Sequence, residues 1–249
     1  MKLTIVGCAG TFPGPESPCS SYLVEHDGFR LLVDAGNGST GVLQRTTGLL
    51  DLDAIVISHL HGDHFLDLVT YTYARRYHPA GLPKPIAVYG PSDIEAHVAG
   101  AFGRPVADLL SAVYDFRPIS GLNRVEIGPF SLDLALMNHP VETYGMRITA
   151  DGRALAYSAD SGVCDELVKL AREADLFLCE ASYLDGEDNP PDIHLTGREA
   201  GEHATRADVG RLLLTHLVPW GDPARTLGEA TAAFAGDVSV ARTCAVFDV

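Results

Sequence analysis

The stretch Ser58-His59-Leu60-His61-Gly62-Asp63-His64 places three imidazoles and a carboxylate close together, directly after the apolar run 53–57. Such a run predicts a buried strand, with the cluster at its C-terminal end. Neutral imidazole and carboxylate are the usual protein ligands of zinc and related divalent metals. A solvated polar loop is the simpler alternative. However, four such groups at this density, in a chain with only 10 His, favour a metal site.

The composition is that of a globular protein with a substantial core. The chain has 249 residues, of which 46% are hydrophobic and 20% charged. This length fits one large or two small domains. No stretch resembles an interdomain linker, so we expect a single domain over 1–249. The formal net charge of −15 disfavours wide contact with nucleic acid, because such contact depends on Lys and Arg.

The cysteines favour a reducing compartment. Five Cys are scattered along the chain without a Cys-x-x-Cys pair, which predicts free thiols in a cytoplasmic protein. The short segment before Cys8 leaves no room for the apolar core of a signal peptide. No apolar run approaches the roughly 20 residues of a membrane span, so we expect no membrane association.

Strands dominate both halves of the chain, with helices between them. Asp27-Gly28 and Asp151-Gly152 predict hairpin turns. Strands are predicted over 2–7, 21–25, 29–34, 54–58, 86–89, 113–117, 123–127, 130–137, 144–149, 153–157, 175–179, 211–215, 238–241 and 243–248. Helices are predicted from His64, near 93–101 with Ser92 as N-cap, near 163–173, over 197–207 behind a capping box at Thr196 and Glu199, and from Asp222-Pro223. This order predicts two mixed sheets packed together, with helices outside them.

Further candidate ligands lie where other predicted strands end. Five strands run into an ionisable residue, namely Asp34, His139, Asp160, Glu180 and His216. Each alone has a simpler interpretation, such as a turn residue or a partly buried histidine whose hydrogen bonds are satisfied within the fold. Together with 59–64 they predict one site at the edge of a sheet, where strand ends converge. Asp67 lies one helical turn beyond His64 and could either support a ligand or be solvated.

The pattern His59-x-His61-x-Asp63-His64, followed by His139, Asp160 and His216, resembles the metallo-β-lactamase superfamily over nearly the whole chain. The resemblance implies an α/β fold, the αββα four-layer sandwich, with two divalent metal ions. The expected metal is zinc, and manganese and iron accept the same ligands. The implied ligands are His59, His61 and His139 for one ion and Asp63, His64 and His216 for the other. Asp160 would bridge the two ions, and Asp34 would support the cluster from behind.

Departures from the family pattern disfavour some branches of the superfamily and their functions. The β-lactamases of this fold carry Cys where Asp160 stands, and flavodiiron proteins carry Glu where His61 stands. The segments 178–182 and 194–196 instead resemble the ribonuclease Z-like branch. That resemblance implies that His194 donates a proton to the leaving oxygen of a phosphodiester and that Glu180 orients it. A solvated loop position is the simpler alternative for His194.

The expected chemistry is hydrolysis by activated water. Two metals roughly 3.5–4 Å apart acidify a shared water and hold the phosphoryl oxygens. Asp63 could also accept the proton of that water. A general acid contributes roughly 10²–10⁴-fold when the leaving group is an alkoxide. His194 would be that acid.

The substrate is expected to be small. Ribonuclease Z grips precursor transfer RNA with a basic arm, whereas the corresponding loop 182–193 carries acidic residues and no Lys or Arg. Segments 7–10, 75–79, 89–93 and 217–220 resemble actinobacterial-type cyclic-nucleotide phosphodiesterases. We therefore expect hydrolysis of cAMP or cGMP to the 5′-monophosphate, and a homodimer such as relatives form. Transfer-RNA 3′ processing, hydrolysis of another small ester or thioester, and metal binding without catalysis remain alternatives.

Overall fold

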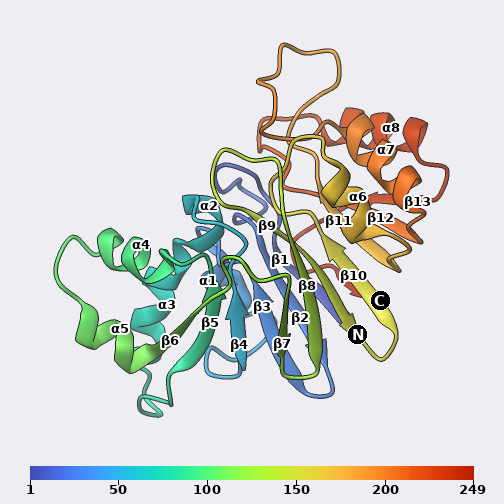
Figure 1. Cartoon of the computed structure of the whole chain (residues 1–249). Coiled ribbons are helices and arrows are strands. Elements are labelled where there is room, and N and C mark those ends of the chain that lie inside the picture. The colour runs from blue at the N-terminus through green and yellow to red at the C-terminus, as the bar shows by residue number, and fades with distance from the viewer.

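Two mixed β-sheets form the centre of the molecule in a computed structural model that describes residues 1–249 (Figure 1). The first sheet has the order β14 (Val246–Asp248), β1 (Lys2–Gly7), β2 (Ser21–His26), β3 (Phe29–Val33), β4 (Ala54–Val56), β5 (Ile86–Gly90) and β6 (Tyr114–Pro118). The second has the order β13 (Asp237–Val240), β12 (Arg211–Thr215), β11 (Leu176–Glu180), β10 (Arg153–Tyr157), β9 (Tyr144–Ala150), β8 (Phe130–Leu136) and β7 (Arg124–Ile127). Each sheet contains both parallel and antiparallel pairs of strands, so both are mixed, as predicted.

Helices cover the outer face of each sheet. Against the first sheet lie α1 (Ser39–Leu43), α2 (Gly62–Phe65), α3 (Asp67–Arg76), α4 (Ile94–Ala101) and α5 (Ala107–Val113). Against the second lie α6 (Asp165–Ala171), α7 (Gly197–Ala207) and α8 (Pro223–Ala233). The predicted αββα sandwich is confirmed. No helix combines the length and apolar character needed to cross a membrane.

Three separate hydrophobic clusters hold the four layers together. The central one contains 25 buried residues from both sheets. Strand β8 shows how the sequence forms it, because Phe130, Leu132 and Leu134 are buried and alternate with half-buried Ser131 and Asp133. The outer clusters, of 20 and 19 residues, lie between each sheet and its helices. Each sheet is therefore covered on both faces, which explains its continuous apolar strands.

The strand directions determine where the site forms. Strands β3 to β6 run parallel to one another, as do β10 to β13. Strand β8 is antiparallel to β9, which is antiparallel to β10, so β8 ends at the same edge as β10. The C-terminal ends of β3 and β4 and those of β8, β10, β11 and β12 thus reach one side of the sandwich.

The structure differs from the sequence-based prediction at short elements and at the N-cap of one helix. Ser92 does not cap α4; its N–H donates to Ser120 Oγ, and the helix begins after Asp93. Helices α1 and α5 have 5 and 7 residues, too few to show a clear periodicity, and they were missed. Of the predicted strand 243–248, only 246–248 forms a regular strand, because Cys244 adopts a left-handed conformation; Cys244 and Ala245 still form backbone hydrogen bonds with Ile5 of β1.

Both predicted hairpin turns are confirmed. Asp27 and Gly28 join β2 to β3, and Asp151 and Gly152 join β9 to β10. All four residues have positive φ, between 47° and 79°. Asp and Gly tolerate this conformation better than other residues, which is why the dipeptide predicts the turn. The capping box at Thr196 and Glu199 is also present.

Candidate metal centre

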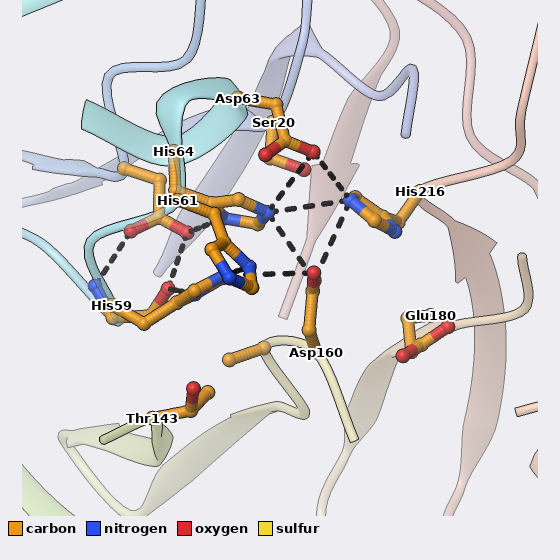
Figure 2. A network of polar contacts seen from close by, with 12 residues as sticks. Ser20, His59, His61, Asp63, His64, Thr143, Asp160, Glu180 and His216 are labelled. Atoms are coloured by element: carbon orange, nitrogen blue, oxygen red, sulfur yellow. Dashed lines mark hydrogen bonds and ion pairs between the residues drawn. The ribbon is translucent and has the colours of Figure 1, made fainter. Parts of the chain in front are cut away.

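The segments that follow five strands bring the predicted ligands and Asp34 to one edge of the sandwich. His59 and His61 follow β4, and α2 carries Asp63 and His64. His139, Asp160 and His216 follow β8, β10 and β12, and Asp34 follows β3. Figure 2 shows the side chains of Asp63, His64, Asp160 and His216 pointing toward one another. All seven predicted ligands are therefore brought together.

The first group contains His59, His61, His139 and Asp160, whose ligand atoms all lie within 4.8 Å of one another. Nδ1 of His61 lies 3.2 Å from Nε2 of His59 and 3.2 Å from Nε2 of His139. Oδ2 of Asp160 lies 3.5 Å from Nε2 of His59. This is the group that the resemblance assigned to the first ion.

The second group contains Asp63, His64, Asp160 and His216, again with ligand atoms within 4.8 Å. Nε2 of His216 lies 3.1 Å from Oδ2 of Asp63 and 3.3 Å from Nε2 of His64. Oδ1 of Asp160 lies 3.2 Å from Nε2 of His64. Asp160 thus presents one oxygen to each group, which suits a bridging ligand.

These spacings fit two divalent metal ions. Ligand bonds of 2.0–2.1 Å in a tetrahedron place neighbouring ligand atoms about 3.3 Å apart. Oδ1 of Asp160 is buried without a hydrogen-bond donor. An unsatisfied buried carboxylate oxygen is costly, so the position calls for a cation. The donor set of imidazoles and carboxylates suits zinc, manganese or iron.

Asp34 supports the second group from behind. Its Oδ2 accepts hydrogen bonds from His64 Nδ1 at 2.8 Å, Ser58 Oγ at 2.8 Å and Tyr157 Oη at 2.7 Å. Its Oδ1 accepts from the Ser58 N–H at 2.7 Å. With Nδ1 bonded to Asp34, Nε2 of His64 faces the ligand group. Such outer partners fix the tautomer and the ring orientation of a ligand.

Two other imidazoles, those of His139 and His216, are oriented in the same way. Nδ1 of His139 donates to the carbonyl oxygen of Ile193 at 2.9 Å. Nδ1 of His216 lies 2.8 Å from Ser182 Oγ, whose hydroxyl donates to the His216 carbonyl. Each Nε2 is left to face the centre.

The backbone at the site is held in unusual conformations. Asp34, Ala159 and His216, each directly after a strand or next to a ligand, have φ of 58°, 51° and 57°. Non-glycine residues adopt this region at a cost of order 1–3 kcal/mol, and such residues cluster at functional sites. Gly10 packs against His216 so closely that a Cβ there would clash with its carbonyl oxygen.

Burial and the neighbouring charges set the protonation of the ligands. Burial, with the charge of His64, lowers the pKa of His59 well below its ordinary value. Burial alone would raise the pKa of Asp160, but His216, His64 and His59 outweigh it and lower the pKa. Burial likewise lowers the pKa of His64, but Asp160 and Asp34 outweigh it and raise the pKa. The carboxylates are thus ionised and attract positive charge to this position.

Glu180 and His194 form a pair beside the second group. Glu180, at the end of β11, is fully buried, and its Oε1 accepts from His194 Nδ1 at 2.8 Å. Two backbone N–H groups, of Ser161 and Ser182, also donate to this carboxylate. Burial would lower the pKa of His194, but the charge and hydrogen bond of Glu180 raise it to about 9. The imidazole is therefore protonated at neutral pH, and Nε2–H is free to donate.

Several residues at the site were not predicted. The Thr11 N–H donates to Asp63 Oδ2 at 2.8 Å, and Ser58, Tyr157 and Ser182 hold ligands or Asp34 in place. Their identities carry no metal-binding signal, although Ser58 and Ser182 lie in segments that the motifs marked.

Asp67 neither supports a metal ligand nor lies in solvent, which were the two alternatives. The residue is buried, not solvated, and its Oδ2 accepts from the Thr40 N–H at 2.6 Å. Asp67 therefore supports the start of α1, and no hydrogen bond joins its side chain to a metal ligand.

A cavity of about 480 Å³ opens beside His194. We call it the side cavity; its walls include Thr11, Tyr183, Leu184, His194, Leu217 and Trp220. Its wall includes no metal ligand, and it reaches the second ligand group through Thr11, whose N–H bonds Asp63, and through Ser182, which bonds His216. It lies within the typical volume of small-molecule sites, about 300–1,000 Å³.

Fold and ligand groups together define a metallo-hydrolase, and comparison with known proteins agrees. Residues 29–217 match the family model described as Beta-lactamase superfamily domain. The chain therefore belongs to the beta-lactamase superfamily.

Two relatives match the whole chain, and a third matches most of it. The uncharacterized protein Rv1339 of Mycobacterium tuberculosis is 40% identical over 254 residues, covering 100% of this chain and 92% of that protein. The probable metallo-hydrolase YhfI of Bacillus subtilis is 32% identical over 252 residues, covering 100% of both. A ribonuclease Z of Mycobacterium bovis is 29% identical, covering 88% of this chain and 86% of that protein.

Solved structures share the fold. The crystal structure of YhfI superposes with a TM-score of 0.88 at 29% identity, covering 99% of each chain. The short form of human tRNase Z superposes with a TM-score of 0.77 at 23% identity, covering 100% of this chain and 99% of the other. The second likeness concerns the fold alone.

Proposed function

We propose that the protein is a metal-dependent phosphodiesterase that hydrolyses 3′,5′-cyclic nucleotides to 5′-monophosphates. The observation that carries the proposal is the buried Glu180 carboxylate bonded to His194 at 2.8 Å, next to two ligand groups that share Asp160. A protonated imidazole beside a dinuclear centre suits a reaction whose leaving group is a poor alkoxide. Esters with a good leaving group need no such acid.

The chain's own residues account for the proton transfers. The oxygen of the attacking water forms a bond to phosphorus while the bond from phosphorus to O3′ breaks. His194 donates its Nε2 proton to O3′, and Glu180 keeps the ring oriented through Nδ1. Two divalent ions, when bound, acidify the attacking water and stabilise charge on the phosphoryl oxygens.

Asp63 combines two roles in this proposal. Its carboxylate faces His216 and is fixed by the Thr11 N–H, which suits a metal ligand. Burial would raise its pKa, but His216 and His64 outweigh it and lower the pKa. A carboxylate with a low pKa holds a proton only briefly, so Asp63 would pass the water proton on to solvent.

The charge around the site favours a small substrate over RNA. Loop 182–193, next to His194, carries Asp185, Glu187, Asp188 and Asp192 without any basic residue. Its nearest cations are already paired, since Arg198 bonds Asp185 and Arg225 bonds Glu187. A polyanion would meet repulsion here, whereas a substrate with one phosphate would meet little.

The test is a side-by-side assay of the metal-reconstituted protein with cAMP, cGMP and a precursor transfer RNA. We expect turnover of at least one cyclic nucleotide and none of the RNA. His194→Ala should keep its metal content and lose roughly 10²–10⁴-fold in turnover. His97→Ala, which removes an exposed histidine from α4, is the matched control and should retain full activity.

Two outcomes would contradict the proposal. Cleavage of the RNA with no turnover of cyclic nucleotides would assign transfer-RNA processing instead. Loss of metal in His194→Ala would make His194 a ligand rather than the acid.

A further inference from the structure

We propose that the side cavity is the nucleobase-binding site and that Trp220 determines affinity by stacking on the base. This inference rests on the proposed function, because it concerns the substrate of that reaction. Three observations lead to it: the side on which the leaving oxygen must lie, an exposed Trp in the cavity wall that packs on a second ring, and the hydrogen-bond acceptors in that wall.

The geometry of a cyclic nucleotide places its base on the side of His194. When the bond between phosphorus and O3′ breaks, O3′ stays on the ribose and receives the proton from His194. Ribose and base must therefore lie next to His194, opposite the attacking water. The side cavity is the space lined by His194 that also reaches Thr11, whose N–H bonds Asp63. A ribose held there leaves the phosphate near the two ligand groups.

An aromatic pair lies at this cavity. Trp220, in the turn after β12, is 76% exposed, although its ring is the largest side chain of the protein. It packs on Phe12 with ring centroids 4.5 Å apart and an interplanar angle of 33°. Phe12 comes from the loop after β1, so the pair joins segments from both ends of the chain. An exposed Trp held in place by a second ring offers a flat face to a base, and such stacking accepts every base.

The cavity wall suits a neutral, flat ring that carries hydrogen-bond donors. Leu184, Leu217 and Val218 supply apolar surface. Asp222 Oδ1 accepts the N–H groups of Ala224 and Arg225, which leaves Oδ2 free. Asn189 donates its amide to the Leu184 carbonyl, which leaves its own side-chain oxygen free. Both free groups accept hydrogen bonds, as recognition of the exocyclic amine of a base requires, and both disfavour a further phosphate.

The first test compares substrates with and without a base. The metal-reconstituted protein and Trp220→Ala are assayed with cAMP and with the 3′,5′-cyclic phosphate of methyl riboside, which has no base. We expect Trp220→Ala to raise KM for cAMP about tenfold or more, and to change KM for the base-free substrate less than twofold. Trp220→Phe should recover most of the affinity. Tyr77→Ala is the matched control, because Tyr77 is also exposed and stacked on a neighbour, Tyr73, on the other outer layer.

The second test does not depend on turnover. Trp220 is the only tryptophan of the chain, so its fluorescence reports directly on stacking. Titration of the reconstituted protein with 5′-AMP should quench this fluorescence in a saturable way, and ribose 5-phosphate should leave it unchanged.

The outcomes separate the two proposals. No turnover of any cyclic nucleotide would reject the proposed function. Turnover with the same KM for cAMP in the wild type and in Trp220→Ala would reject the base site but not the proposed function. An equal loss for cAMP and the base-free substrate would mean that Trp220 only holds the loop, and would also overturn the inference.

Discussion

At the scale of single residues, the site depends on which nitrogen of each imidazole is engaged. His64, His139 and His216 all bind protein oxygens through Nδ1, so Nε2 faces the ligand groups. His194 also bonds through Nδ1, and its partner is the buried carboxylate of Glu180, just as the partner of His64 is the carboxylate of Asp34. A carboxylate partner raises the pKa of each of these two imidazoles. The difference is that His64 belongs to a ligand group that contains Asp160, whereas His194 belongs to neither of these groups, which leaves its proton available for donation.

The pKa of His194 predicts how activity depends on pH. Because Glu180 raises this pKa to about 9, the imidazole carries its proton below pH 9 and loses it above. The contribution of the ion pair to folding is fully present below the ordinary pKa of about 6.5 and is lost as pH rises through 9. We therefore expect kcat for cAMP to fall above about pH 9. The measurement is the pH profile of kcat.

A substrate with a better leaving group is the control for this profile. Bis(4-nitrophenyl) phosphate releases a phenolate that needs no proton, so its profile should lack the fall near pH 9. In His194→Ala the fall should be absent for cAMP as well. A fall that persists in that variant would assign the pKa to another group.

At the scale of elements, the ends of strands position the chemistry and the caps of helices hold the intervening loops. Helix α7 begins with the capping box of Thr196 and Glu199, two residues after His194. Thr196 Oγ1 accepts from the Glu199 N–H at 3.2 Å, and the Glu199 carboxylate accepts from the Thr196 N–H at 2.8 Å. This reciprocal pair fixes where the acidic loop ends.

Removing the cap should therefore affect stability. Thr196→Ala loses the side-chain acceptor and should lower the free energy of unfolding by about 1 kcal/mol, measured by urea denaturation. Thr196→Ser keeps the hydroxyl and should recover most of that loss. Equal stabilities of Thr196→Ala and the wild type would show that the cap contributes nothing.

The sequence predicted the long elements and the ligands, and it failed where the signal is not local. Apolar strands followed by candidate ligands, such as 211–215 before His216, indicated both the strand and the position of a candidate ligand. The carboxylate of Asp67, by contrast, bonds the backbone of Thr40 on a distant segment, a contact that no local pattern reveals. Tyr157 appears in sequence as one more apolar strand residue, yet its hydroxyl bonds Asp34, 123 positions away.

At the scale of the whole molecule, the two sheets share the metal centre. Both ligand groups combine residues from the first sheet's loops, at 59–64, with residues from the second sheet's loops, at 139, 160 and 216. Any ion bound by these groups would therefore join the two halves of the sandwich in addition to the 25-residue central cluster.

Metal removal should consequently destabilise the fold. An ion that binds only the folded state contributes about 2.7 kcal/mol at 100 times its Kd. Chelation should lower Tm, and added zinc should restore it, as measured by thermal unfolding. Asp160→Ala, which removes the shared ligand, should show little change in Tm on chelation. A full metal-dependent shift in that variant would contradict a bridging role for Asp160.

The positions of the ligands along the chain also determine when each ligand group is complete during synthesis. As the polypeptide is synthesised, the first ligand group is complete once Asp160 has emerged, whereas the second must wait for His216. The last strand, β14, then pairs with β1 from the opposite end of the chain. Contacts of such large sequence separation form slowly. The site of His59 thus needs no residue beyond Asp160, whereas the site of His216 is complete only when most of the chain has been synthesised.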